Sequence, residues 1–258
     1  MKKEEDQLRN SLPYEIYLTY KTKSVVPEYI FQQYEEFAKQ YHINFFDDHD
    51  CMDYMSDFGK NNKELFNSIV DVYKSHPNGA HKADMWRYAV LYNNGGIYFD
   101  IKTMLVKNLV DIFDHTGKNW YTVISAEQHR FPEYNIHQGI IASPKNNAIL
   151  KDALKLYIQT PVLDFQKYYW TGCNQLYSLC CEYYQSNLSQ SRDKAKEHKL
   201  FKSPTITLPD LFLMQERCSK KVAEYKSDQK RYGLHCVIEN DIDCVVFNTR
   251  DTQYGHKW

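Results

Sequence analysis

The 258-residue sequence predicts an α/β domain, with a mostly parallel central sheet and flanking helices. Segments with strand patterns alternate with segments with helix patterns over about the first 150 residues. The chain is 43% hydrophobic and 25% charged, which is an ordinary globular composition. Its length suits one sizeable core and no internal repeat is visible, so we expect a single domain over residues 1–258.

Local patterns divide the first part of the chain. YEIYLTY, at 14–20, alternates in polarity and is rich in β-forming residues, so it predicts a strand. Pro27 is well placed to open a helix that extends to about residue 39, because proline is favoured at the first helical position. HINFFDD, at 42–48, predicts a second strand that ends in acids, and residues 61–75 predict a helix. The turn residues Pro77-Asn78-Gly79 stop that helix.

The segment HKADMWRYAVLYNNGGIYFDIK, at 81–102, predicts a helix, a glycine turn and a short apolar strand. The helix covers 81–93, Gly95-Gly96 form the turn, and the strand 97–100 ends on an acid. The later expected elements are strands at 120–127 and 136–143, helices at 146–158 and 168–184, and short strands at 235–239 and 243–248. The stretch 186–199 is polar and aperiodic, so we expect it to form an exposed loop.

Charge and composition argue against several classes of protein. The net charge is -1 and the basic residues are dispersed, so nothing predicts nucleic-acid binding. The seven cysteines have no regular spacing and no C-x-x-C pair, so we expect mostly reduced thiols. Residues 1–10 lack the apolar core of a signal peptide, and no apolar run approaches the ~20 residues of a membrane span. We therefore expect a soluble, cytoplasmic protein with no transmembrane segment.

Three charged residues within 81–102 are candidates for function. Asp84 and Arg87 are three residues apart and share one face of the predicted helix. Asp100 follows an apolar strand, at the carboxyl end where open α/β sheets bind ligands. An acid there needs a partner such as a sugar hydroxyl, a ribose or a divalent cation. The structural alternative is a surface Asp84–Arg87 ion pair, which contributes under about 1 kcal/mol, with Gly95-Gly96 as a helix C-cap.

The same segment resembles the core of the glycosyltransferases with a DXD sugar-binding motif. This superfamily includes yeast mannosyltransferases, bacterial capsule enzymes, members in large DNA viruses and clostridial glucosylating toxins. IYLTYKTKSVVPEYI is similar to the family's first strand, FFDDHDCMDYM to its second strand and acidic helix, and IHQGIIASPKNNAIL to a later strand. The resemblance implies a GT-A (Rossmann-like) fold, with a donor-binding core at 14–155 and an acceptor-side, closing part at 156–258.

The resemblance also implies roles for individual residues. Tyr20 would stack on the nucleobase, and Asp84 and Arg87 would hold the donor sugar and the diphosphate. Asp100 is the first acid of the DXD, and Gln138 falls where the family often has an asparagine near the transferred sugar. The implied donor-binding residues are Thr19, Tyr20, Asp84, Arg87, Tyr98, Gly96, Asp100 and Trp258.

The sequence departs from the family pattern at the second acid, because it reads Asp100-Ile101-Lys102. Lysine cannot replace a carboxylate as a ligand of Mn²⁺ or Mg²⁺. Lys102 therefore neutralises the leaving diphosphate, or the metal is held by Asp100 and a residue from elsewhere, or Lys102 is a solvated strand-end lysine. His256 and Trp258 have the spacing with which several relatives close the site, and imidazole suits Mn²⁺. The implied catalytic residues are Asp84, Asp100, Gln138 and Lys102, and the implied metal ligands are Asp100 and His256.

The function implied by this resemblance is a retaining glycosyltransferase that uses a nucleotide-sugar donor, a UDP- or GDP-sugar, and a glycan or other hydroxyl acceptor. The first alternative is a catalytically degraded module that binds nucleotide sugars or glycans, because the DXD is incomplete. A nucleotidyltransferase is disfavoured, since that chemistry usually needs paired acids for its metals. Thr171-Gly172 resembles a Thr-Gly element that opens a helix near the acceptor in relatives, but a plain helix N-cap is the preferred interpretation of Thr171.

Overall fold

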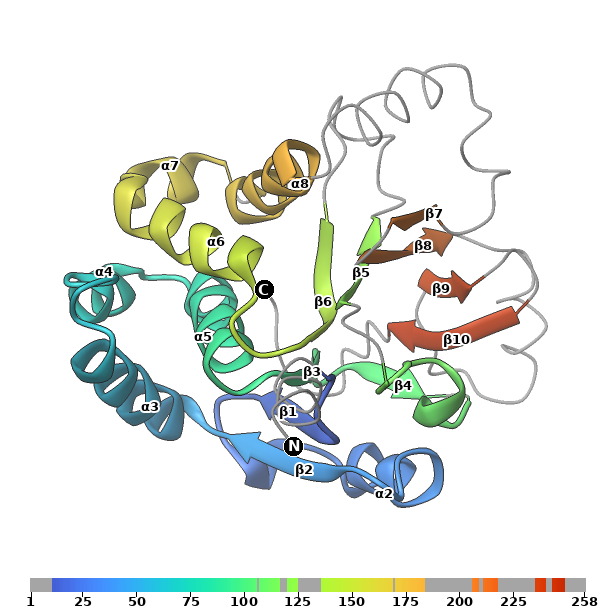
Figure 1. Cartoon of the computed structure of the whole chain (residues 1–258). Helices are drawn as coiled ribbons and strands as arrows, with labels where there is room; N and C mark the ends of the chain where they lie inside the picture. Colours follow the sequence, from blue (N-terminus) through green and yellow to red (C-terminus); the bar gives the residue numbers. More distant parts are fainter. Residues whose placement is uncertain are drawn as a thin grey trace, which may run out of the picture.

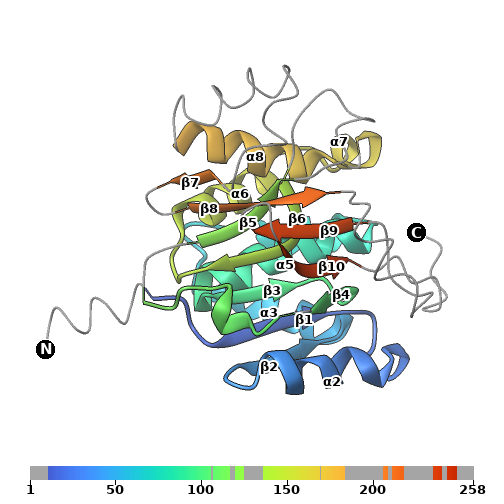
Figure 2. The ribbon, with the colours of Figure 1, turned by 90° about the vertical axis from the view of Figure 1, so that its right-hand side faces the viewer.

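The computed structural model describes residues 11–105, 107–116, 120–124, 136–168, 170–183, 206–208, 211–217, 235–239 and 243–248. These residues form an α/β arrangement in which most of the helices gather on one side of a long sheet (Figure 1). Turned by 90°, the strands lie one above another, from β2 at one edge upwards (Figure 2). The α/β class expected from the sequence is confirmed.

The elements follow in chain order. The helices are α2 (Glu28–Phe37), α3 (Asp48–Asn61), α4 (Ile69–Ser75), α5 (Gly79–Asn94), α6 (Ala148–Gln159), α7 (Val162–Lys167) and α8 (Thr171–Tyr183), with short 3-10 turns η1 (Lys23–Val25) and η2 (Leu109–Asp111). The strands are β1 (Glu15–Thr19), β2 (His42–Phe46), β3 (Gly96–Phe99), β4 (Thr103–Leu105), β5 (Trp120–Ile124), β6 (Ile136–Ser143), β7 (Ile206–Leu208), β8 (Leu211–Arg217), β9 (His235–Glu239) and β10 (Asp243–Asn248).

The sheet has the strand order β2-β1-β3-β6-β5-β8-β9-β10-β4, with β7 paired to β8. β1 is parallel to both β2 and β3, and β5 is parallel to β8. β6 is antiparallel to both β3 and β5, so β2, β1, β3, β5 and β8 share one direction and β6 is reversed among them. The mostly parallel centre is thus confirmed, and the strands after β8 continue as antiparallel pairs.

Core residues cover both faces of the sheet. Along β3, Ile97 and Phe99 pack into the core shared with α2, whereas Tyr98 packs into the core shared with α3, α4, α5, α6 and α8. This alternation is the period of two expected of a strand buried on both faces. The same alternation places Tyr98, and Asp100 two residues later, on the face of the sheet that α5 covers.

The prediction of one helix over 61–75 is wrong in its first half. α3 ends at Asn61, and α4 begins only at Ile69. The earlier helix starts at a capping box, in which the Asp47 side chain accepts hydrogen bonds from the first turn and Asp50 bonds back. The short elements β4, α7, β7 and β8 were not expected, and the predicted loop 186–199 lies outside the described residues.

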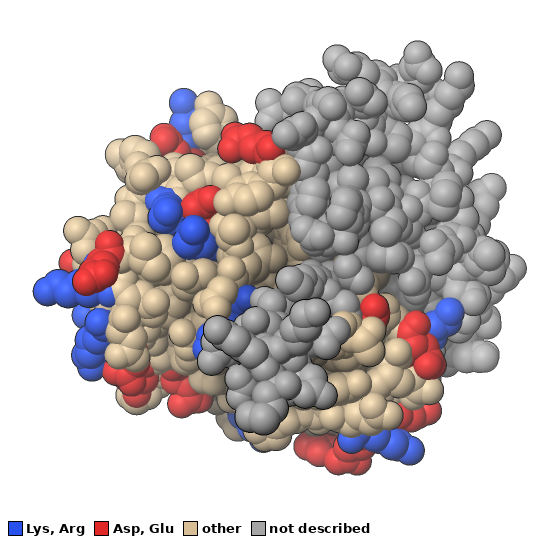
Figure 3. All heavy atoms as spheres, in the orientation of Figure 1, with Lys and Arg blue, Asp and Glu red and all other residues tan. Residues whose placement is uncertain are grey.

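Acidic and basic side chains are interspersed over the described part of the face in Figure 3. No helix among the described residues is both long enough and apolar enough to cross a membrane.

Candidate functional site

The strand β3 delivers an acid to the carboxyl edge of the sheet. Its first residue, Gly96, has a φ of 114°, and a Cβ there would lie 2.7 Å from the Glu15 carbonyl oxygen of β1. A side chain is therefore excluded at this position by both conformation and space. At the other end of β3, the Asp100 N–H donates to the Gly139 carbonyl at 2.8 Å. This bond joins Asp100 to the neighbouring reversed strand β6.

Helix α5 carries the other two candidate residues, Asp84 and Arg87. It begins where the Asn78 side chain accepts from the Ala80 N–H at 2.8 Å, and it ends at Gly95, whose φ of 71° suits glycine. Residues Met85 to Leu91 are all buried, so this part of the helix is enclosed on every side. Arg87 is one of them, at 5% exposure, and a buried guanidinium requires partners.

Arg87 connects two carboxylates. Its Nη2 lies 3.1 Å from Asp84 Oδ1, and its Nη1 lies 3.6 Å from Asp100 Oδ1. The same guanidinium donates to the Ala83 carbonyl from Nε and to the Gln138 carbonyl from Nη1. The side chains of Asp84 and Arg87 are 13% and 6% exposed, so the surface ion pair considered above is wrong.

Tyr98 completes the contact between Arg87 and Asp100. The Arg87 guanidinium lies over the Tyr98 ring, 4.3 Å from its centre, and the Tyr98 hydroxyl donates to Asp100 Oδ1 at 2.8 Å. Asp100 Oδ1 therefore has two protein partners, whereas its side chain is 37% exposed. The exposed part of this carboxylate is available to a ligand at the sheet edge.

The cluster contains two carboxylates and one guanidinium. Burial raises the pKa of Asp84, and this effect is opposed by Arg87 and by the hydrogen bond from Tyr157. Burial lowers the pKa of Arg87, but its neighbours Tyr98, Asp84 and Asp100 more than reverse this, so Arg87 keeps its charge. With both carboxylates ionised, one negative charge in the cluster has no cationic partner within it, which favours hydrogen-bond donors or a cation as ligands.

Residues of β6 lie beside the Asp84–Arg87–Asp100 cluster. A Cβ on Gly139 would lie 2.8 Å from Asp100 Oδ2, so this glycine leaves the room that the carboxylate occupies. The Gln138 side chain is 4% exposed and lies beside the Cys173 thiol. Its amide has no nitrogen or oxygen hydrogen-bond partner among the described residues. A buried amide without such partners, on a residue whose backbone carbonyl binds Arg87, is suited to a polar ligand.

The other predicted site residues in or next to β1 and β3 make different contacts. The Thr19 hydroxyl contacts the Cys51 sulfur at 3.1 Å. Tyr20 is 8% exposed and packs in the core shared with α2, so stacking on a base would require its ring to leave that core. Gly96 is at the far end of β3 from Asp100.

Lys102 lies in the turn between β3 and β4, where the Thr103 N–H donates to the Asp100 carbonyl at 2.8 Å. The preceding Ile101 is 5% exposed and belongs to the core shared with α2. Lys102 itself is partly exposed and makes contacts of its own. His256 and Trp258 lie outside the described residues, so their predicted positions stay predictions.

A divalent cation fits the described residues only in part. Asp100 offers a partly exposed carboxylate oxygen, which suits Mn²⁺ or Mg²⁺. Within the described part of the chain, however, no three His, Cys, Asp or Glu side chains come together as a metal site. The donor set of a bound cation is thus incomplete in these residues alone.

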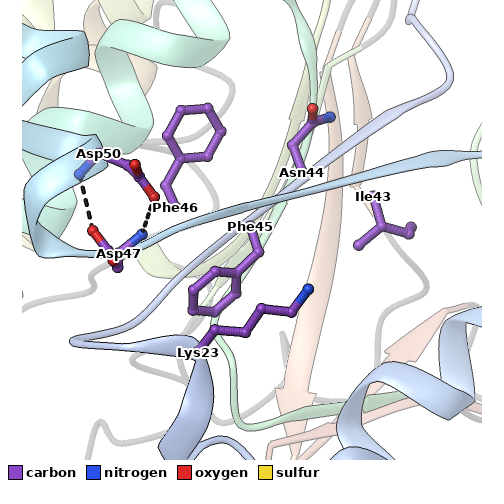
Figure 4. A pocket seen from close by; sticks show the side chains of 7 residues that line it. All are labelled: Lys23, Ile43, Asn44, Phe45, Phe46, Asp47 and Asp50. Carbon is purple, nitrogen blue, oxygen red and sulfur yellow. Dashed lines mark hydrogen bonds between the residues drawn. The ribbon is translucent and has the colours of Figure 1, made fainter.

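A separate cavity of about 560 Å³ lies along the edge strand β2 (Figure 4). Its lining residues are Lys23, Ile43, Asn44, Phe45, Phe46, Asp47 and Asp50. Asp47 and Asp50 bond to each other's backbone in the α3 capping box, and Lys23 lies over the Phe31 ring. These polar groups therefore have structural partners, and none of the lining residues belongs to the Asp84–Arg87–Asp100 cluster.

Sequence reasoning did not identify Tyr157 as part of the site. The Tyr157 hydroxyl of α6 donates to Asp84 Oδ2 at 2.8 Å. In the sequence, Tyr157 continues the apolar spacing of Ala153 and Leu154, so it is indistinguishable from an ordinary core residue. No local signal identifies its partner, which is 73 positions away.

Parts of the chain are similar to known proteins. Residues 14–121 match the family described as "Glycosyltransferase sugar-binding region containing DXD motif". A stretch of 75 residues is 32% identical to "Initiation-specific alpha-1,6-mannosyltransferase" of Saccharomyces cerevisiae, covering 29% of this chain and 15% of the yeast protein. A solved structure, "PaToxG Glycosyltransferase", aligns with a TM-score of 0.49 at 16% identity, covering 76% of this chain and 81% of that one.

The matched segment begins at β1 and ends in β5, so it contains Asp84, Arg87 and Asp100. It includes both elements, α5 and β3, that bring these side chains together. Residues 14–121 of this chain are therefore similar to the glycosyltransferase sugar-binding region that contains the DXD motif.

Proposed function

We propose that the chain is a retaining glycosyltransferase that moves a sugar from a nucleotide-diphosphate donor to a glycan or other hydroxyl acceptor. The observation that carries the proposal is the Asp84–Arg87–Asp100 cluster at the carboxyl end of β3, in which Asp84 and Arg87 are buried and Asp100 is partly exposed. It lies within the segment that matches a sugar-binding region. Retention and the nucleotide-sugar donor are supported by the family resemblance alone.

The two carboxylates are suited to the donor sugar. Ionised carboxylates only accept hydrogen bonds, and sugar hydroxyls donate them. Asp100 is 37% exposed and Asp84 13%, so Asp100 is the more accessible acceptor. We assign both to donor-sugar hydroxyls, with the buried Gln138 amide as a further polar contact. Arg87 already binds four oxygen acceptors of the protein, so its main task is to orient the carboxylates.

The diphosphate needs positive charge from another source. The cluster has a net negative charge when both carboxylates are ionised, and this repels phosphate oxygens. Lys102 is two residues from Asp100, and we propose that it stabilises the charge that develops on the leaving diphosphate. A divalent cation at Asp100 would supply the same charge, with its remaining ligands from the donor or from outside the described residues.

The proposed transfer breaks the bond between the anomeric carbon and the phosphate oxygen, and the diphosphate keeps the electron pair. The acceptor hydroxyl oxygen forms the new bond to the anomeric carbon, from the same face, and its proton passes to the departing phosphate oxygen. The protein contributes mainly by positioning the two reactants and excluding water.

The division into a donor-binding core at 14–155 and an acceptor-side part at 156–258 stays a prediction, and its boundary falls inside α6.

The test is an assay of sugar release and transfer by the purified chain, using a panel of UDP- and GDP-sugars with and without EDTA. Asp100→Asn and Asp84→Asn should lower turnover by at least on the order of 10²-fold, because each removes a charged contact made at the reacting sugar. Asp57→Asn, on the exposed side of α3, is the matched control and should change nothing. Full activity in both site variants would refute the assignment.

The degraded-module alternative is separated by the same experiment. A chain that binds nucleotide sugars but neither hydrolyses nor transfers them, with or without metal, would be a binding module. Turnover that persists in EDTA and is lost in Lys102→Met would support Lys102 as the source of positive charge. Turnover that is lost in EDTA and kept in Lys102→Met would assign that charge to a metal.

A further inference from the structure

We propose that Tyr157 is a positioning residue for Asp84, and that Gly172 leaves the space in which the Tyr157 hydroxyl reaches that carboxylate. This inference rests on the proposed function, since it concerns how the donor-sugar contact is held. It goes beyond that function because it brings α6 and α8 into the site.

Asp84 is held by two donors from two helices. Arg87, one turn along α5, is 3.1 Å from Oδ1, and the Tyr157 hydroxyl of α6 is 2.8 Å from Oδ2. Because each oxygen has its own partner, rotation of the carboxylate about its Cβ–Cγ bond would break both contacts. The lone pairs left over for a ligand therefore have a fixed direction. Without Tyr157, only one oxygen would be held.

Tyr157 is itself fixed in place. It is 1% exposed, and its ring stacks on Phe165 of α7 with the centres 4.5 Å apart and the planes 28° apart. Tyr88 of α5 meets the same ring edge-on at 5.9 Å. Burial and the adjacent Asp84 charge raise the pKa of Tyr157 well above its ordinary value, so the hydroxyl keeps the proton that it donates. A rigid, protonated donor is what a positioning residue needs.

Gly172 explains why the hydroxyl fits. This glycine lies in the first turn of α8, within the Thr-Gly element noted in the sequence. A Cβ at this position would overlap the Tyr157 hydroxyl and would lie 3.2 Å from Asp84 Oδ2. Glycine therefore has a steric reason here that is independent of helix capping. Three helices, α5, α6 and α8, meet at this one carboxylate.

Other charged or titratable groups also face Asp84. Arg87 and His81 come from its own helix, Asp100 from the end of β3, and Cys173 from α8. Among the described residues, the side chains of Arg87 and Tyr157 each contact one oxygen of Asp84, and Tyr157 is the uncharged one of the two. Tyr157 is therefore the partner that can be removed without altering the charge of the site.

The experiment compares Tyr157→Phe with Tyr34→Phe by calorimetric binding of GDP-mannose, UDP-glucose, GDP and UDP. Tyr34 is an equally buried tyrosine in the other core, and its hydroxyl has no hydrogen-bond partner among the described residues. Tyr157→Phe should weaken binding of the sugar nucleotide about tenfold, which is about 1.4 kcal/mol. It should leave the affinity for the free diphosphate unchanged. Tyr34→Phe should leave both affinities unchanged.

A double-mutant cycle with Gly172→Ala gives a second, geometric readout. The added methyl group should weaken sugar-nucleotide binding in the wild-type background, because it displaces the hydroxyl. In Tyr157→Phe the hydroxyl is absent, so the same methyl group should have much less effect, and the two changes should not add. Additive losses would contradict the proposed contact.

Failure of the inference and failure of the proposed function are distinguishable. If the wild type prefers sugar nucleotides over free diphosphates and Tyr157→Phe keeps the full preference, the role of Tyr157 is refuted and the proposed function stands. If the wild type and Asp84→Asn bind each sugar nucleotide no more tightly than its diphosphate, Asp84 does not hold a donor sugar, and both proposals fail.

Discussion

Replacement of Arg87 by methionine should expose how the site is held together. Methionine keeps much of the aliphatic volume of the side chain and removes the charge. The change would delete donors to Asp84, Asp100 and two backbone carbonyls at once. Because Arg87 is 5% exposed, water cannot readily take the place of these donors.

The expected magnitude follows from burial. Removing one partner of a buried ion pair destabilises a protein by about 3–5 kcal/mol, because the other charge is left without compensation. A domain of ordinary stability has about 5–15 kcal/mol in total. Arg87→Met should therefore lose a large fraction of the free energy of unfolding at neutral pH. Lys60→Met, which breaks an ion pair whose side chains are 74% and 71% exposed, should lose under about 1 kcal/mol.

The loss of stability in Arg87→Met should depend on pH. In the wild type, burial raises the pKa of Asp84 and Arg87 opposes that rise. Without Arg87, the pKa of Asp84 in the folded state moves further above its value in the unfolded state. The folded state then binds this proton more tightly than the unfolded state does. Stability relative to the wild type should then recover as the pH falls through the raised pKa, because Asp84 becomes neutral. At pH values above it, the full deficit should remain.

The assay is urea denaturation of the wild type, Arg87→Met and Lys60→Met at a series of pH values from neutral to mildly acidic. Sugar-nucleotide binding by the same samples would show whether the carboxylates still reach a ligand. A deficit below about 1 kcal/mol at neutral pH would place Arg87 among weakly coupled surface charges. A deficit that does not change with pH would contradict the assignment of the unpaired charge to Asp84.

Two further changes test other parts of the structure. Burial lowers the pKa of His76 to about 4 from 6.5, so the unfolded chain takes up that proton first and stability should fall by up to about 3 kcal/mol as the pH drops through this interval. His76→Phe should remove this loss in urea denaturation at pH 4.5 and 7.5, and an unchanged pH dependence would contradict it. Gly139→Ala should reduce turnover, because its Cβ would meet Asp100 Oδ2 at 2.8 Å. Gly79→Ala, where a Cβ would meet nothing within 4 Å, is the control, and equal activity of the two variants would refute the steric role of Gly139.

Much of the first part of the sheet and of the candidate site could be predicted from the chain. The strand and helix patterns located β1, β2, α5, β3 and β6 closely, because each has its own apolar period and its own capping or turn residues. Asp84 and Arg87 could be paired from their helical spacing alone. Placing Asp100 beside them required the resemblance or the fold, since nothing local joins α5 to the end of β3.

The rest depended on contacts between distant segments. β4 has three residues and pairs with β10, far along the chain, so no local pattern reveals it. The direction of β6 also leaves no mark in its side-chain alternation, because a strand buried on both faces has the same pattern in either direction.

Local sequence thus determined which segments fold as strands and helices and that acids stand at the end of a buried strand, because these properties depend on neighbours a few residues apart. The tertiary structure decided that Arg87 is buried between two carboxylates, and that Tyr157 and Gly172 meet Asp84. Apart from the Asp84–Arg87 pair, those contacts join residues of different helices and strands, so they exist only once the helices have packed on one face of the sheet.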